Sequence, residues 1–243
     1  MRSVLMSCLT AFCLAIPPAA ATAQEKRQSA SFDLVIRGLR IGNLAFTSVE
    51  NGGAYALSGR VQTSGLAGML RKMRYDASTR GRISGARYAP QRYEQKGGSG
   101  NRVTEEVIVW EGGVPRLEKQ QPPRAPRENA LDPKAQRGTV DTLTAIYVTL
   151  GDVAQQNACN VDLTLYDGRY RMGLKIGRPQ ADAQGNLTCS GQYIRQGGFS
   201  AEEMAERVSF PFTLSYQPLG SGEYRVKEVA MESLWGRARL VRR

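Results

Sequence analysis

The chain has 243 residues, a formal net charge of +11 and no histidine. The absence of histidine excludes Ser-His-Asp and Cys-His nucleophile systems, histidine zinc sites and imidazole acid–base catalysis. No phosphate-binding loop, dinucleotide-binding glycine motif or nucleophile-elbow motif occurs either. We therefore predict that the protein is not an enzyme and that it needs no cofactor or metal.

Residues 1–23 have the pattern of a secretory signal peptide. Arg2 supplies a positive end, the apolar stretch Val4–Ile16 is too short to remain as a membrane anchor, and a small-x-small motif ends at Ala23. We expect cleavage after Ala23 and a periplasmic mature protein that begins at Gln24.

The mature chain, residues 24–243, is long enough for a substantial core, and we expect a single antiparallel β domain. No later segment approaches the roughly eighteen apolar residues of a membrane-spanning helix. In an exported protein we expect no nucleic-acid partner. The basic charge is therefore expected to serve solubility, or contacts with anionic envelope polymers, lipid headgroups or acidic proteins.

The four cysteines divide between the leader and the mature chain. Cys8 and Cys13 lie in the leader, and a lipoprotein signal is disfavoured because Cys13 follows a bulky phenylalanine and Cys8 comes too early. Cys159 and Cys189 remain in an oxidising compartment, where a disulfide is expected. Closing a loop of about 30 residues contributes about 3–4 kcal/mol in the chain-entropy model.

The N-terminal half of the mature chain has the alternation and turn residues of antiparallel strands. After a polar end at 24–31, strands are expected within 32–46, with a break at Gly38, and then at 54–61, 75–93 and 103–110. Glycine-rich turns separate them. Prolines between 120 and 138 exclude a regular ladder there and predict a long surface connection.

One stretch near the middle, Thr139–Gly151, is the best helix candidate. Apolar residues recur in it at helical spacing, namely Val140, Leu143, Tyr147 and Leu150. Thr139 or Asp141 can cap the first turn, and Gly151 can close the last turn in the left-handed conformation. Many β-branched residues favour a strand instead. As a helix, the stretch would be an apolar element surrounded by a curved sheet.

The clearest local structure is a hairpin at 159–176. Asp167-Gly168 is a preferred dipeptide for a two-residue type I′ turn. That turn predicts a register in which Leu165 faces Tyr170, Leu163 faces Met172 and Val161 faces Leu174. The turn residues and the hydrophobic alternation agree on this hairpin.

The hairpin register restricts the expected disulfide. If a third strand at 187–194 simply followed in meander order, Cys159 and Cys189 would be about 9.5 Å apart, or two strand spacings. A disulfide requires a Cα separation below about 7 Å. Either Cys159 lies beyond the end of its strand and folds over, or the third strand is not the next neighbour.

The C-terminal region combines a short helix with strands. Ser200–Arg207 begins with a capping box, because Ser200 is followed three residues later by Glu203. A strand at 210–216 alternates regularly. A strand from Tyr224 slips phase before Val229, which predicts a β-bulge.

Carboxylates are the remaining candidates for acid–base chemistry. The glutamate pairs at 105–106 and 202–203 are adjacent in sequence, so in a strand the two members point to opposite faces. We interpret all four as solvated surface acids. The predicted turn explains the presence of Asp167, and the start of the predicted helix explains Asp141. Neither residue therefore needs a catalytic role.

A basic amphipathic segment at Gly65–Arg74 is the candidate contact with a membrane or ligand. Its apolar stripe consists of Leu66, Met69, Leu70 and Met73, and its cations are Arg71, Lys72 and Arg74. Such a segment can rest on an anionic membrane surface or cover a ligand cavity. Packing on the sheet as an apolar plug is the alternative.

Five short motifs, in this order along the chain, resemble a known family. They are FDLVIRGLRIG at 32–42, TSGL at 63–66, DTLTAIY at 141–147, YDGRY at 166–170 and GRARL at 236–240. The set resembles bacterial domain-of-unknown-function family 3108 (DUF3108), whose members look like exported envelope proteins. The resemblance implies a periplasmic, all-β protein and supplies no catalytic residues.

The expected fold is all-β and mainly antiparallel. We predict one strongly curved sheet, or a half-open barrel or β-spiral, with one central helix and a short second helix. The expected function is non-enzymatic binding of an apolar or amphipathic envelope ligand, or of a periplasmic partner protein, on a concave sheet face. The alternatives are a scaffolding role in envelope integrity and, less favoured, a carboxylate-dependent hydrolase.

Overall fold

The described strands form one antiparallel sheet, and all of them except β8 (Val153–Ala154) follow one another in a single linear order. The structure is a computed structural model that describes residues 25–65, 68, 72–100, 102–125 and 127–243. The strands are β1 (Lys26–Ile36), β2 (Leu39–Asn51), β3 (Ala54–Thr63), β4 (Met73–Ser84), β5 (Arg87–Ser99), β6 (Arg102–Glu111), β7 (Val114–Gln121), β8 (Val153–Ala154), β9 (Val161–Tyr166), β10 (Arg171–Ala181), β11 (Leu187–Gly197), β12 (Ser209–Pro218), β13 (Glu223–Ser233) and β14 (Gly236–Arg242). The expected mainly antiparallel, strongly curved sheet is confirmed, and the sheet is open.

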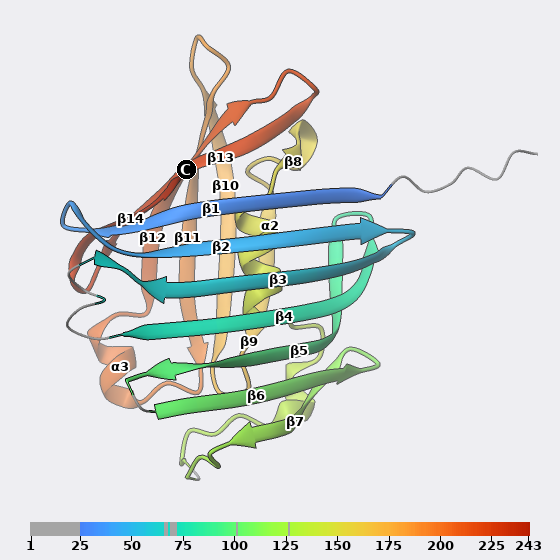
Figure 1. Cartoon of the computed structure of the whole chain (residues 1–243), viewed down its shortest axis with the longest axis vertical. Helices are drawn as coiled ribbons and strands as arrows, with labels where there is room; N and C mark the ends of the chain where they lie inside the picture. The colour runs from blue at the N-terminus through green and yellow to red at the C-terminus, as the bar shows by residue number, and fades with distance from the viewer. Residues whose placement is uncertain (1–24, 66–67, 69–71, 101, 126) are drawn as a thin grey trace, which may run out of the picture.

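The sheet consists of two halves that join at the chain ends. Its strand order is β7-β6-β5-β4-β3-β2-β1-β14-β13-β12-β11-β10-β9, and β8 pairs with β13 off this path. Strand β1 pairs with β14 antiparallel, with Phe32 opposite Arg242. The β1–β7 half and the β9–β12 strands cross each other in Figure 1, and helix α2 (Thr142–Leu150) lies between them.

Helix α2 confirms the helical interpretation of the central stretch. Asp141 is its N-cap, and Leu143 packs so closely on β3 that a Cβ at Gly59 would overlap it. Gly151 ends the helix as expected, but its φ is −68°, so the left-handed closure is wrong. Its N–H still donates to the Tyr147 carbonyl at 2.8 Å, and an extended residue therefore suffices.

Helix α2 and aromatic side chains fill the space between the two halves. Tyr147 of the helix makes edge-to-face contacts with Phe46 and Tyr88, each with ring centroids 5.8 Å apart. The hydroxyls of Tyr88 and Tyr147 both donate to Glu50, at 2.7 and 2.8 Å. Core residues therefore occupy the concave face around α2, where the ligand was expected.

The connection between β7 and α2 reaches both edges of the open sheet. At the β7 edge, the Gly138 N–H donates to the Gly113 carbonyl at 2.8 Å. At the β9 edge, the Val140 N–H donates to Thr164 and its carbonyl accepts from Tyr166, each at 2.9 Å. A short 3₁₀ helix, η1 (Pro133–Gln136), directly precedes these contacts. The predicted surface connection thus satisfies part of the edge hydrogen-bonding groups that an open sheet leaves free.

The hairpin of β9 and β10 is confirmed, but its predicted register is wrong by two residues. Met172 pairs with Leu165, and Leu174 with Leu163. The loop has four residues because the Asp167 carboxylate accepts the N–H groups of Arg169 and Tyr170, at 2.9 and 2.7 Å. A shift of two residues keeps every side chain on its predicted face.

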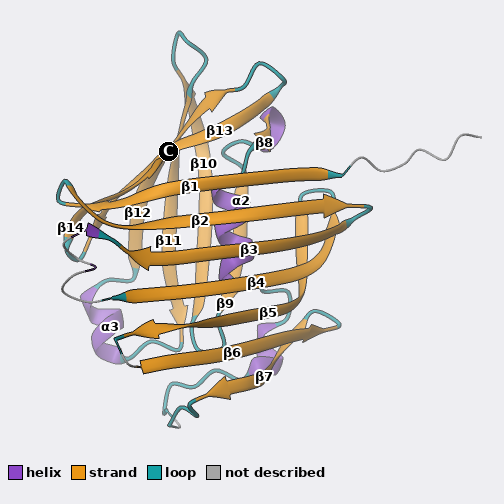
Figure 2. Cartoon of the chain, in the orientation of Figure 1, coloured by secondary structure: helices purple, strands orange, loops and turns teal. Residues whose placement is uncertain are grey.

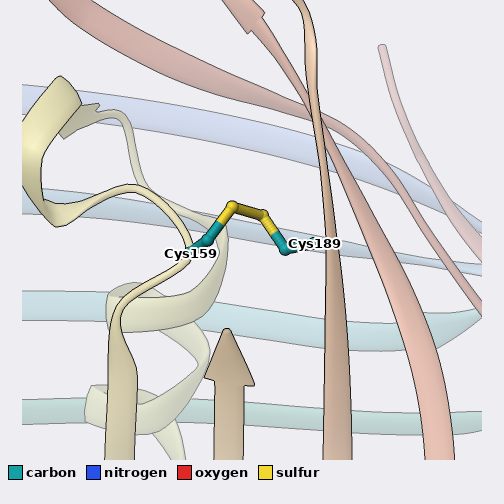
Figure 3. The surroundings of a disulfide bond; sticks show 2 residues. All are labelled: Cys159 and Cys189. Carbon is teal, nitrogen blue, oxygen red and sulfur yellow. A yellow bond between two sulfur atoms is a disulfide. The ribbon is translucent and has the colours of Figure 1, made fainter. Parts of the chain in front are cut away.

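The expected disulfide joins Cys159 and Cys189, with a Cα separation of 5.5 Å (Figure 3). Strand β11 does follow β10 in meander order. Cys159 precedes β9 and has a φ of 57°, which turns the chain over the end of β10. The first of the two geometric solutions is therefore correct.

The C-terminal region carries a short helix and three strands (Figure 2). Helix α3 (Ala201–Glu206) has the predicted capping box between Ser200 and Glu203. The predicted bulge is present as a register shift between Ser215 and Tyr216 in the pairing of β12 with β13. Strand β14 is not among the strands expected from the sequence.

Candidate functional site

The basic segment at 65–74 is only partly described. Leu66, Met69, Leu70 and Arg71 lie outside the described residues, and Lys72 is exposed. Met73 and Arg74 begin strand β4, so the predicted helical stripe does not extend to Met73. Arg74 pairs with Asp76 at 2.6 Å rather than remaining free. Membrane or ligand contact by this segment stays a prediction.

Asp141 is a buried structural acid, as the helix-start interpretation predicted. Its side chain is fully buried and accepts three hydrogen bonds, from the Thr144 N–H at 2.8 Å, the Thr144 hydroxyl at 2.6 Å and the Thr79 hydroxyl at 3.0 Å. Burial raises the pKa of Asp141, and these hydrogen bonds oppose that shift. The carboxyl is therefore enclosed between the start of α2 and strand β4.

Glu105 and Glu106 point to opposite faces of β6, as adjacent strand residues must. Glu105 lies on the outer face between Lys96 and Lys119, whose hydrogen bonds and charges lower the pKa of Glu105 to about 2. Glu106 is only 5% exposed, so its assignment as a solvated acid is wrong. Its carboxylate pairs with Arg124 at 2.9 Å, while Oε1 has no hydrogen-bond partner among the described residues.

Glu106 meets the turn of the β9–β10 hairpin, which comes from the opposite end of the sheet. A Cβ at Gly168 would overlap Glu106 Oε1, so the turn backbone lies directly against the carboxylate. Burial raises the pKa of Glu106 and of Asp167, and the charge of Asp167 raises that of Glu106 further. Arg124 opposes the shift of both acids. We call this junction of β6 with the hairpin turn the seam.

An arginine-lined cleft of about 460 Å³ opens at the seam. We call it the seam cleft, and its cationic side chains are Arg102, Arg124, Arg127 and Arg169. They come from the start of β6, from the β7–α2 connection and from the hairpin turn. Apolar residues of the connection, including Pro123 and Leu131, line it as well.

Aromatic stacking positions two of the four arginines. The guanidinium groups of Arg127 and Arg169 lie 5.8 and 4.8 Å from the Tyr170 ring centroid. That ring stacks on Phe199, with centroids 4.4 Å apart. Arg127 also donates to the Tyr170 hydroxyl at 3.4 Å, and the other N–H groups of the two guanidinium groups can meet a further partner.

The positive charge of the seam cleft is only partly neutralised. Arg124 pairs with Glu106, whereas Arg102, Arg127 and Arg169 make no ion pair within 4 Å of any described acid. Nε of Arg169 is buried and has no hydrogen-bond partner among the residues that the structure describes. Planar guanidinium donors of this kind fit the oxygens of a phosphate or carboxylate.

The described residues hold no metal cluster of three or more cysteines and acids. They also include no helix long and apolar enough to span a bilayer. Glu106 and Asp167 are two acids that the fold brings together at the seam, beside the cleft. Sequence reasoning missed this pair because no motif links two residues so far apart along the chain.

A family model for proteins of unknown function, DUF3108, matches residues 31–178, which is more than half of the chain. The chain belongs to the DUF3108 family. The resemblance drawn from the five motifs is thereby confirmed. No curated protein matches the chain.

This DUF3108 protein is also similar to a solved structure. The crystal structure of a β-barrel-like protein of domain of unknown function DUF1849 from Brucella abortus matches with a TM-score of 0.52 and 13% identity. The match covers 92% of this chain and 98% of the other. At this identity the likeness concerns the fold alone, and it assigns no activity to either protein.

Glu106→Gln should change how the stability of this DUF3108 protein depends on pH. Because burial raises the folded-state pKa of Glu106, the protonated acid stabilises the fold below its unfolded pKa, about 4.3. That contribution is lost as the pH rises through the folded pKa. We therefore expect the wild type to lose stability relative to Glu106→Gln between about pH 4 and neutral pH, measured by urea unfolding.

Glu105→Gln is the matched control, because the pKa of Glu105 is lowered to about 2. Its charged form stabilises the fold above the unfolded pKa, so the wild type should gain stability relative to this variant as the pH rises. If the difference in the free energy of unfolding between wild type and Glu106→Gln stayed constant with pH, Glu106 would not be a buried acid with a raised pKa.

Proposed function

We propose that this DUF3108 protein is an exported, non-catalytic binding protein of the cell envelope whose seam cleft takes the anionic group of an amphipathic ligand. The proposal places residues 24–243 in the periplasm as one domain after cleavage of residues 1–23. The signal-peptide pattern and the Cys159–Cys189 disulfide support export. The observation that carries the binding proposal is the set of three cleft arginines without an acidic partner among the described residues.

The chemistry of the cleft favours a phosphate or carboxylate joined to a small apolar part. Arg127 and Arg169 share the Tyr170 ring and can donate together to one oxyanion. Pro123 and Leu131 provide apolar surface beside these donors. The concave sheet faces, by contrast, are covered by α2 and the core, which disfavours a ligand there.

Replacing Arg127 and Arg169 together by Gln should weaken anion binding about tenfold or more, since each charge-assisted hydrogen bond contributes about 1.5–3 kcal/mol. Isothermal titration calorimetry with dihexanoyl phosphatidic acid and with inorganic phosphate measures this. Tighter binding of the lipid indicates a headgroup with its acyl part, and equal binding indicates free phosphate. If the wild type binds neither probe, the proposal is wrong.

Arg82→Gln with Arg87→Gln is the matched control. Both side chains are exposed near the β4–β5 turn, at the other end of β4 from Arg74, and they make no ion pair with a described acid. The control removes the same amount of charge from another part of the surface. If its affinity stays within about twofold of wild type, the loss in the cleft variant is due to the cleft arginines and not to a lower net charge.

A carboxylate-dependent hydrolase is the second candidate, because Glu106 and Asp167 are buried acids next to the arginines. The test is hydrolysis of 4-nitrophenyl phosphate and 4-nitrophenyl acetate by wild type and Glu106→Gln. Turnover that the substitution removes would make the protein an enzyme. A protein that neither binds the probes nor turns over would instead favour the scaffolding role.

A further inference from the structure

Two neighbouring turns at one end of the sheet expose large apolar side chains. Trp235 is 69% exposed, Leu39 is 65% exposed and Leu234 is 38% exposed. Leu39 opens β2, and the other two lie in the β13–β14 turn. We call these three residues the apolar tip.

The two turns lie side by side although they are almost 200 residues apart in sequence. The Arg37 N–H donates to the Arg237 carbonyl at 3.0 Å, and Ile36 pairs with Ala238. In Figure 1 the β1–β2 turn and the start of β14 lie at the same, left-hand end of the molecule. The sheet therefore joins these side chains into one patch.

Cations surround the apolar tip. Arg37 and Arg237 are exposed and make no ion pair within 4 Å of any acid in the described part of the chain. Arg40 is exposed too, at 3.5 Å from Asp33.

A further apolar side chain lies near the tip. Val208 is 40% exposed and follows Arg207. The Arg207 guanidinium donates to the Glu232 carbonyl just before the β13–β14 turn.

The described ends of the basic segment at 65–74 meet the sheet at this end as well. The Ser64 N–H donates to the Ile41 carbonyl at 3.0 Å, next to Arg40. The Lys72 carbonyl accepts from Gly100 at 3.0 Å, in the β5–β6 turn. The chain thus enters and leaves that segment on the side of the molecule that carries the apolar tip.

We infer that the apolar tip, with Arg37 and Arg237, is a docking surface for an anionic lipid bilayer. Tryptophan and leucine at the ends of turns can insert at the headgroup level, where an amphipathic indole is stable. The flanking guanidinium groups attract anionic headgroups. The other tryptophan, Trp110, is only 6% exposed, so Trp235 is the indole positioned to contact a partner. This surface is separate from the seam cleft.

The test is co-sedimentation of the purified protein with vesicles of phosphatidylcholine containing about one third phosphatidylglycerol, at low salt. Leu39→Ser with Trp235→Ser should weaken binding about tenfold or more. Arg37→Gln with Arg237→Gln should weaken it about tenfold, and high salt should remove that difference. The exposed pair Arg82→Gln with Arg87→Gln should stay within about twofold of wild type.

Tryptophan fluorescence gives an independent readout. Because Trp110 is already buried, a blue shift on addition of vesicles reports Trp235. Trp235→Phe should keep vesicle binding and lose the shift. Since the substituted residues are exposed, the thermal midpoint of each variant should stay near that of wild type, which separates lost docking from lost folding.

Three results would overturn the inference. The first is absence of wild-type binding to the anionic vesicles. The second is equal binding to pure phosphatidylcholine, which would deny the arginines a role. The third is a concentration-dependent dimer that Leu39→Ser with Trp235→Ser abolishes, which would make the tip an interface between copies. Arg127→Gln with Arg169→Gln should leave vesicle binding unchanged, so this surface and the seam cleft can fail separately.

Discussion

Asp141→Ala should lower the free energy of unfolding by about 2–4 kcal/mol. The substitution removes the N-cap of α2, for which about 1 kcal/mol is typical. Because the capped Thr144 N–H is buried, leaving it without an acceptor raises this cost to about 1–3 kcal/mol. The hydroxyls of Thr144 and Thr79 each lose one hydrogen bond, but they keep the Tyr55 hydroxyl and the Arg92 carbonyl as partners. Urea unfolding at neutral pH measures the loss, and the thermal midpoint should fall by about 10 °C.

Asp132→Ala is the matched control for this prediction. Asp132 also caps a helix, η1, and accepts the Lys134 N–H at 2.9 Å, but its side chain is exposed. Water replaces that hydrogen bond, so we expect a loss below about 1 kcal/mol. An equal effect of the two substitutions would show that burial around Asp141 adds nothing to its capping role.

The elements that the sequence predicts well are those whose local signals agree. Ser200 and Glu203 form the expected capping box of α3, because that signal lies within one turn of helix. Strand β14 carries no such signal. Its side chains are mostly half-buried rather than alternating, because it pairs with β1 on one side and β13 on the other at the junction of the two halves. The start of β1, expected to be a polar, irregular end, pairs with β2 from Lys26 onward, so a tertiary contact overrides its polar sequence.

The seam cleft could not be predicted from the sequence. Its residues come from β6, a proline-rich connection and a hairpin turn, and only the folded sheet brings them together. Two of its arginines lie in the connection, where their spacing has no periodicity. Glu106 illustrates the difficulty. Alternation along β6 correctly separates it from Glu105, but it cannot tell which face of the strand is covered by the turn at Gly168.

Removing the disulfide is the second large effect that we expect. Cys159→Ala with Cys189→Ala should lower the free energy of unfolding by about 3–4 kcal/mol, because the bond closes a 30-residue separation in the unfolded chain. Alanine is preferable to serine here, since Cys159 and Cys189 are 4% and 0% exposed and a hydroxyl would be buried without a partner. Urea unfolding with and without dithiothreitol measures the effect.

The disulfide should also stabilise the packing of strands outside the loop that it closes. It joins the residue that precedes β9 to strand β11, across the end of β10. The chain that enters β9 comes from α2, so the disulfide also ties the helix side of the core to the C-terminal strands (Figure 3). Reductant should bring wild type to the unfolding midpoint of the double alanine variant, and it should not change that variant. If wild type had the same midpoint with and without reductant, and if its unfolded form reacted with a thiol reagent in both cases, the two cysteines would not be joined in the protein.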